Sequence, residues 1–184
     1  ADGELGIQWR PEVTEATVDH ALTAESDAAF DISEDSLRLA WKTTVAFRGG
    51  EREFFTFTLP VDYFVERVDG ANIRGWEIRE ATGVRTLQVQ LLKPAKQQEV
   101  LTIILRRQTA APAVGAETLP VPYIGVSQAL QHDGRITVRR SPALDVRVAE
   151  SKSIARINAD GEPQVPSAES PLGMRLFQAY EFRT

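Results

Sequence analysis

Residues 37–47 read LRLAWKTTVAF, and every second residue of this stretch is apolar or threonine. The alternating set is Leu37, Leu39, Trp41, Thr43, Val45 and Phe47. A period of two places alternate side chains on opposite faces of a pleated strand. The stretch therefore predicts one long β-strand with a buried face, and at ~3.3 Å per residue it would extend roughly 36 Å.

The same alternation returns after a pair of glycines. Gly49 and Gly50 tolerate the positive φ angles that tight reversals require. Residues 54–59 then alternate phenylalanine or leucine with threonine, and Pro60 ends the strand because proline has no N–H to donate. We therefore expect residues 37–47 and 54–59 to form a hairpin.

Turn signals recur roughly every ten residues, which is typical of β-sandwiches and barrels and not of βαβ units. Further alternating strands are expected at 61–68, 73–79, 84–92 and 100–106. The predicted fold class is all-β, an antiparallel β-sandwich of about 10–12 strands, with a partly closed β-barrel as the alternative. The expected core consists of Leu37, Leu39, Trp41, Val45, Phe47, Phe55, Phe57, Leu59, Leu87, Val89, Leu91, Leu101, Ile103 and Leu105.

Residues 1–184 are expected to form a single β-sandwich domain, with a candidate internal boundary at 109–122. That boundary segment is rich in alanine and proline and shows no sustained period. Beyond it, shorter strands are expected at 123–130, 135–139, 144–148 and 154–157. Asp133 and Gly134 are interpreted as a turn between the first two of these strands, because Asp-Gly is a frequent hairpin signal.

Charge and composition exclude several classes of partner. The chain carries 21 basic and 26 acidic residues, which are interspersed and give a net charge of −5. Such a surface argues against nucleic-acid binding and against a basic membrane-binding face. The longest apolar run, residues 100–105, is far short of the ~20 residues that cross a bilayer, so no membrane insertion is expected. Cysteine is absent, which removes disulfides and thiolate ligands.

No motif for catalysis or metal binding is found in the sequence. His20 and His132 are the only histidines, and neither belongs to a short-spaced ligand pair. No Gly-x-Ser-x-Gly elbow is present. Residues 158–162 match part of a calcium loop, but the later acidic ligands of such a loop are missing, so a turn explains them. We therefore predict no catalytic residue, no metal ligand and no cofactor.

One region combines acidic and aromatic residues. Its acids are Asp62, Glu66, Asp69, Glu77 and Glu80, which lie close in sequence to Tyr63, Arg74 and Trp76. Paired carboxylates across a cleft would suit a glycosidase-like hydrolase. An exposed tryptophan beside polar groups would suit a carbohydrate-binding module. Tyr63, Arg74 and Trp76 are therefore the candidate ligand-binding residues. The acids also have an ordinary structural explanation in strands and turns.

The pattern as a whole favours a non-catalytic structural or protein-interaction module. The chain begins at Ala1 and its only methionine is Met174, so we expect a piece of a larger, extracytoplasmic bacterial protein. The expected partners are other domains of the same polypeptide or a separate protein. Carbohydrate binding and glycosidase-like hydrolysis are the two alternatives.

Overall fold

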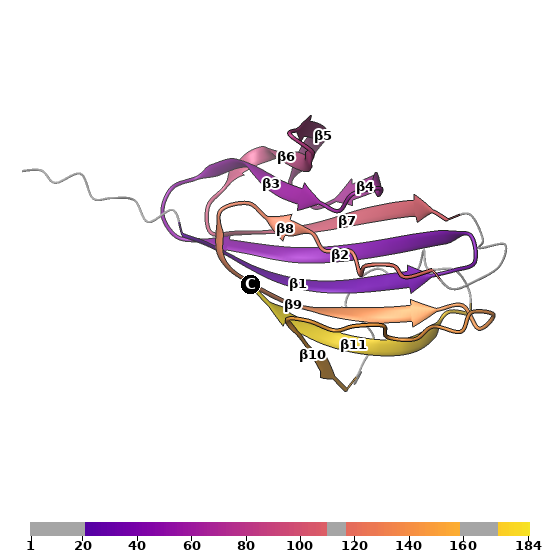
Figure 1. The fold of residues 1–184 in the computed structure, drawn as a ribbon. Coiled ribbons are helices and arrows are strands. Elements are labelled where there is room, and N and C mark those ends of the chain that lie inside the picture. The colour runs from indigo at the N-terminus through magenta and orange to yellow at the C-terminus, as the bar shows by residue number, and fades with distance from the viewer. Residues whose placement is uncertain (1–20, 110–116, 159–172) are drawn as a thin grey trace, which may run out of the picture.

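The computed structural model describes residues 21–109, 117–158 and 173–184, and within these ranges it contains strands and no helix (Figure 1). The strands are β1 (Leu22–Ile32), β2 (Ser36–Phe47), β3 (Arg52–Leu59), β4 (Phe64–Asp69), β5 (Ile73–Ala81), β6 (Val84–Ala95), β7 (Gln98–Gln108), β8 (Gly125–Val126), β9 (Ala129–Arg140), β10 (Ile154–Ile157) and β11 (Arg175–Arg183). In this part of the chain no helix is long and apolar enough to cross a membrane.

Two sheets form the fold. The larger has seven strands in the order β10-β11-β9-β1-β2-β7-β4, and the smaller has four in the order β5-β6-β3-β8. Their strand pairs are antiparallel except for β1 and β9, and the sheets are not closed into a barrel. The predicted β-sandwich is therefore confirmed over the barrel alternative.

The parallel pair joins segments that are distant in sequence. β1 lies beside β9, with Ala28 opposite Ile136 and Phe30 opposite Val138. The predicted boundary segment 109–122 falls between them in sequence, and its residues 110–116 lie outside the described ranges. Strands from both sides of that segment thus build one sheet.

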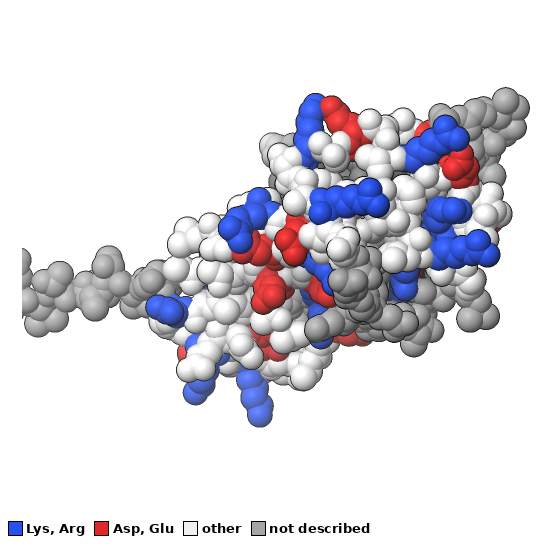
Figure 2. All heavy atoms as spheres, turned by 90° about the horizontal axis from the view of Figure 1, so that it is seen from below, with Lys and Arg blue, Asp and Glu red and all other residues white. Residues whose placement is uncertain are grey.

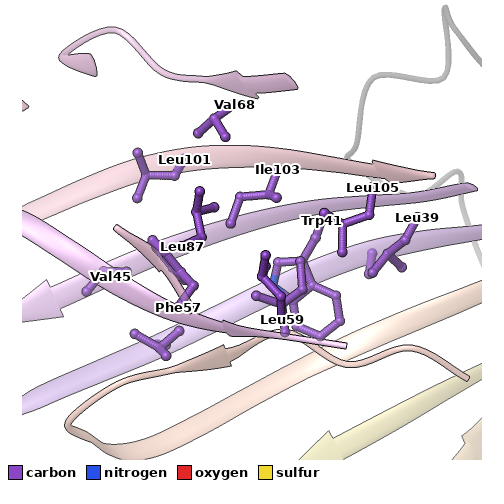
Figure 3. Packing of buried hydrophobic residues seen from close by; sticks show 14 of the residues in the cluster. Leu39, Trp41, Val45, Phe57, Leu59, Val68, Leu87, Leu101, Ile103 and Leu105 are labelled. Atoms are coloured by element: carbon purple, nitrogen blue, oxygen red, sulfur yellow. The ribbon is translucent and has the colours of Figure 1, made fainter. Parts of the chain in front are cut away.

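The core lies between the sheets, and every residue predicted for it is buried. Side chains of β2 and β7 meet those of β3 and β6, as Figure 3 shows. Trp41 has no exposed surface, and its ring lies 5.6 Å from Phe182 and 5.5 Å from Tyr123, measured between ring centroids. The alternation read from the sequence therefore gave the correct inward face of these strands.

The predicted hairpin of residues 37–47 with 54–59 is wrong. β2 pairs with β1 and β7, whereas β3 pairs with β6 and β8. Gly49 and Gly50 do have positive φ angles of 71° and 76°, but their loop carries the chain from one sheet to the other. The buried faces of β2 and β3 meet across the sandwich, where the rings of Phe47 and Phe55 are 6.0 Å apart.

The predicted turn at Asp133-Gly134 is also wrong, because β9 runs straight through both residues. Gly134 is needed there for close packing. A Cβ atom at this position would lie 2.5 Å from the ring of Phe182 and 2.6 Å from the carbonyl oxygen of Ser26. The glycine therefore allows β1 and β11 to approach β9, and it does not reverse the chain.

One shorter element differs as well. The strand expected at 144–148 is irregular in the structure, and no strand occurs between Arg140 and Ile154. The strand expected at 154–157 is present as β10, which pairs with β11.

Candidate interaction surface

β5 is the most exposed strand of the described structure. It lies at the end of the four-stranded sheet, pairs with β6 among the described strands, and has no fully buried residue. The other strands that end a sheet are shorter: β8 spans 2 residues, β10 spans 4 and β4 spans 6, against 9 for β5. Proteins usually shorten or cover such edges, because their unpaired backbone groups attract further strands.

A tight turn ends β5 on one side, and a β-bulge interrupts it near the other end. Thr82 and Gly83 form a two-residue turn to β6, and both have positive φ, 50° and 77°. These angles match the turn type that suits the right-handed twist of a hairpin. At the other end a β-bulge shifts the register between Ile73 and Gly75. The regular part of the strand therefore runs over residues 75–81.

The turn also decides which backbone groups point away from β6. Ala81 and Val84 flank the two-residue turn, so they form a hydrogen-bonded pair, and alternate residues of β5 do the same further along. The N–H and C=O groups of Trp76, Ile78 and Glu80 consequently point toward the free side of β5. We call this free side, over residues 75–81, the β5 edge.

Two apolar side chains lie along the β5 edge on one face. Trp76 is opposite Val89 and Ile78 is opposite Leu87, and both partners on β6 are buried in the core. Trp76 and Ile78 nevertheless remain 39% exposed each. The inward face of the four-stranded sheet thus extends beyond the area that the seven-stranded sheet covers. Trp76 and Ile78 lie in this uncovered part and are partly exposed to solvent.

Charges occupy the opposite face of β5. Glu77 and Arg79 are both exposed and form an ion pair with each other along the strand. Such a surface pair contributes at most about 1 kcal/mol to stability. Its two charges are therefore available to other partners at little energetic cost.

The three residues predicted to bind a ligand do not share one surface. Tyr63 is 3% exposed and lies in the core, where burial raises the pKa of its hydroxyl to about 12 despite the nearby Arg107. Trp76 lies on the β5 edge, and Arg74 is an exposed residue in the bulge that precedes it. Only Trp76 and Arg74 are neighbours.

Four acids of the same region lie on edge strands of different sheets, and Asp62 lies in the turn before β4. Glu66 on β4 is 3.5 Å from Arg106, and Asp69 at the end of β4 is paired with Arg67. The carboxylate of Glu77 is on β5, in the other sheet. Each of these three acids has an arginine partner.

A buried polar network, which the sequence did not predict, surrounds His132. Its Nε2 atom is 2.8 Å from the hydroxyl of Ser26, and its Nδ1 atom is 2.7 Å from the hydroxyl of Tyr123. Burial lowers the pKa of His132 to about 4, and the charge of Asp133 opposes this with a smaller effect. The imidazole is therefore neutral at pH 7. The network depends on the pairing of β1 with β9, which no local motif announces.

A serine beside a histidine is a combination that nucleophilic enzymes use. Here Ser26 is 4% exposed and His132 is 2% exposed. The rings of Trp41, Tyr123 and Phe182 lie within 5.3–5.9 Å of the imidazole, measured between centroids. The pair is thus enclosed by aromatic side chains, and its hydrogen bonds satisfy polar groups inside the core. His20 lies outside the described residues.

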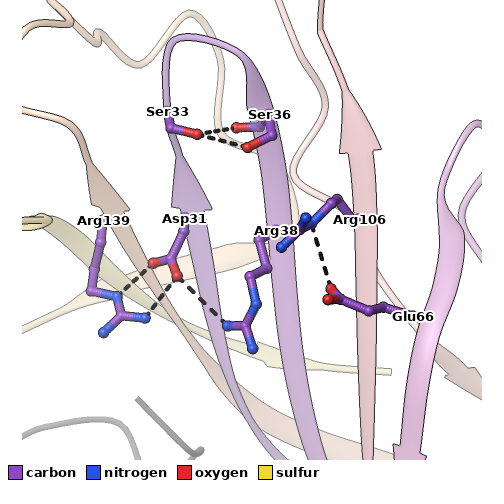
Figure 4. Close-up of polar contacts among 7 residues, drawn as sticks. All are labelled: Asp31, Ser33, Ser36, Arg38, Glu66, Arg106 and Arg139. Atoms are coloured by element: carbon purple, nitrogen blue, oxygen red, sulfur yellow. Dashed lines mark hydrogen bonds and ion pairs between the residues drawn. The ribbon is translucent and has the colours of Figure 1, made fainter. Parts of the chain in front are cut away.

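The outer face of the seven-stranded sheet carries a buried ion cluster (Figure 4). Asp31 accepts two hydrogen bonds from Arg139, at 2.7 and 2.9 Å, and Arg38 lies 3.9 Å from the same carboxylate. Asp31 and Arg38 are almost fully buried. The cluster links β9, β1 and β2 and is a structural feature of the sheet.

A shallow hollow of about 890 Å³ lies on the same sheet, near β10. Charged side chains of both signs line it, including Glu25, Lys42, Glu181 and Arg183. Charges of both signs are also interspersed over the face of the molecule seen in Figure 2. Among the described residues no group of three or more histidine or acidic side chains is arranged to hold a metal ion.

No family model and no curated protein matches the sequence. Solved structures do share the fold. The chain is similar to an M1 zinc metallopeptidase from Deinococcus radiodurans, with a TM-score of 0.50 and 11% identity over 92% of this chain. It spans about 40% of the length of that protein. A non-cellulosomal cohesin from Archaeoglobus fulgidus is more distant, with a TM-score of 0.34 and 11% identity over 64% of this chain and 91% of the cohesin. At 11% identity the likeness to the metallopeptidase is one of fold alone.

Proposed function

We propose that this chain is a non-catalytic protein-interaction module of a larger polypeptide, and that it binds its partner by strand addition at the β5 edge. The observation that carries the proposal is that β5 is a nine-residue edge strand of its sheet, with Trp76 and Ile78 partly exposed on its apolar face. In strand addition, main-chain hydrogen bonds supply affinity and alternate side chains supply specificity.

The β5 edge offers both components. The backbone groups of Trp76, Ile78 and Glu80 point toward the free side at the spacing of an antiparallel ladder. An added strand would also cover the exposed parts of Trp76 and Ile78. Complete burial of a large apolar side chain contributes ~1.5–3 kcal/mol, so partial burial of two such residues is a substantial share of a moderate affinity.

The two alternative functions have less support from the geometry. A carbohydrate platform would depend on Trp76 alone, because Tyr63 is in the core. A hydrolase would need its acids to face each other across a cleft, at roughly 5–10 Å. Glu66 and Glu77 instead belong to different sheets, and each is paired with an arginine.

Site-specific photo-crosslinking in the intact polypeptide tests the proposal. Benzoylphenylalanine in place of Trp76 should form adducts that map by mass spectrometry onto one extended peptide segment. The same probe in place of Leu130, which is 76% exposed on β9, is the matched control and should form none at that segment.

A second substitution tests whether the contact is strand addition. Ile78→Pro removes an N–H that points to the free side, and it spares the hydrogen bonds to β6. We expect this change to abolish the adduct at position 76. Equal adducts at positions 76 and 130 would show that the β5 edge is not the binding surface. An adduct that survives Ile78→Pro would show that the contact is not strand addition.

A further inference from the structure

The geometry points to a second copy of this chain as the strand that binds the β5 edge. This inference rests on the proposed function and names its partner. Two β5 strands would pair antiparallel about a two-fold axis at Ile78, so that two four-stranded sheets join into one continuous sheet.

The length of the regular strand selects the register. Residues 75–81 lie between the bulge at Ile73–Gly75 and the turn at Thr82-Gly83. The middle residue of this segment is Ile78. An antiparallel pairing that uses the whole segment from both copies must therefore place Ile78 opposite Ile78 of the second copy.

The charges on the outer face are complementary in this register. Glu77 of each copy faces Arg79 of the other, which gives two opposite-charge pairs related by the two-fold axis. These residues form the closer type of cross-strand pair, because their own N–H and C=O groups are engaged with β6. Opposite charges in directly facing positions stabilise a sheet, and like charges destabilise it. Glu77 and Arg79 already form an ion pair within one strand, and both side chains are exposed to solvent. Replacing that pair by pairs between the two copies therefore costs little free energy.

The apolar residues meet on the inner face. Ile78 packs against its own symmetry mate. Trp76 directly faces Glu80 of the other copy and lies diagonal to Ile78 of that copy. Aromatic side chains reach diagonal neighbours across a strand pair. Trp76 and Ile78, the two apolar residues that each copy leaves partly exposed, thus form one cluster of four side chains across the axis.

Both neighbouring registers are less favourable. A two-fold axis at Arg79 would place two guanidinium groups directly opposite each other, and an axis at Glu77 is unfavourable on two grounds. A two-fold axis at Glu77 would place two carboxylates directly opposite each other. It would also draw the bulge at Ile73–Gly75 into the paired segment, where it interrupts the ladder. Charge and backbone geometry therefore select the same axis at Ile78.

Sedimentation equilibrium on the folded chain, over roughly 1–200 µM, tests the inference, since a self-associating edge gives a concentration-dependent mass. We expect a monomer–dimer equilibrium. Arg79→Glu turns both cross-strand ion pairs into repulsions and should weaken dimerisation by about tenfold or more. Glu77→Arg combined with Arg79→Glu exchanges the charges, and it should restore the wild-type constant to within about threefold.

Two further variants complete the design. Ile78→Lys places two positive charges on the axis and should abolish the dimer, whereas Leu130→Lys, an exposed apolar residue away from β5, should leave it unchanged. Far-UV circular dichroism checks that each variant is folded. A folded wild-type chain that is monomeric throughout this range, or a double charge exchange that does not restore association, would overturn the inference.

The two proposals fail in different ways. If crosslinks from position 76 map to another protein and the chain is monomeric, the second copy is excluded and the interaction edge stands. If the chain dimerises and crosslinks map to residues 75–81 of a second copy, both hold. If position 76 yields no specific adduct in the intact polypeptide, both are wrong.

Discussion

β2 and β5 are both regular strands with alternating side chains, yet their surroundings differ. β2 has β1 on one side and β7 on the other, and a second sheet covers its inner face. β5 has β6 on one side, and its inner face extends beyond that cover. Trp41 on β2 is fully buried, whereas Trp76 on β5 is 39% exposed. Alternation thus tells which way a side chain points, and the neighbouring layer decides whether it is buried.

The largest expected effect is the loss of stability when Trp41 is removed, and removal of Trp76 is the comparison. Trp41→Ala should lower the free energy of unfolding by about 3–5 kcal/mol, because it leaves a cavity among Tyr123, His132 and Phe182. Trp76→Ala should lower it by about 1–2 kcal/mol, because the side chain is already partly in water. Urea denaturation at a low chain concentration measures both.

Phe is the conservative control for each position. Trp41→Phe should recover part of the loss at the buried site, and Trp76→Phe should be close to wild type in stability. Equal losses for the two alanine variants would mean that β5 is covered in solution to the same degree as β2.

A smaller effect distinguishes the polar network in the core from the exposed charges of β5. The pKa of His132 falls from 6.5 to about 4 on folding, so between these values the unfolded chain binds a proton that the folded chain does not. The stability that the neutral imidazole contributes is present above pH 6.5 and is lost as the pH falls toward 4. The loss amounts to about 3 kcal/mol at most.

The measurement is the free energy of unfolding against pH. His132→Gln should flatten the slope of the unfolding free energy between pH 4 and 6.5. His20→Gln leaves His132 as the one histidine and should retain the pH dependence that His132 contributes. Arg79→Ala on β5 should leave the slope unchanged. A slope that His132→Gln does not alter would show that this imidazole titrates freely in the folded state.

The sequence was sufficient for the inward faces and insufficient for the pairing. The positions of Leu39, Trp41 and Val45 follow from a period of two, which depends on backbone geometry alone. β3 could hydrogen-bond to β2 in one sheet or pack against it from the second sheet. The direction of the loop at Gly49 and Gly50 decides between these two arrangements. Both arrangements bury the same alternate residues, so the pattern cannot distinguish them.

The candidate sites show the same limit. Tyr63 and Trp76 are both aromatic residues among charges, but one is in the core and the other is at an edge. Exposure of Trp76 follows from the position of β5 at the end of its sheet, which is a property of the topology. The contact between Ser26 and His132 joins residues 106 positions apart through the parallel pair of β1 and β9. Contacts of this separation leave no local signal.

The smallest expected effect compares two strand glycines, one in each region. Gly134→Ala places a methyl group 2.5 Å from Phe182 and 2.6 Å from the carbonyl of Ser26, so β1 or β11 must move. We expect a loss of about 1–3 kcal/mol in the free energy of unfolding. Gly75→Ala meets no atom within 4 Å, and a change of less than about 0.5 kcal/mol is expected.

Denaturation curves for both variants, with far-UV circular dichroism as the probe, make this comparison. The reason for the difference is space and not backbone conformation, since neither Gly75 nor Gly134 has a positive φ. A larger residue should therefore widen the gap: Gly134→Val should cost more than Gly134→Ala, and Gly75→Val should remain close to wild type. If the two alanine variants lose the same stability, Gly134 is not closely packed between β1 and β11. The Asp133-Gly134 pair would then be better explained as a turn.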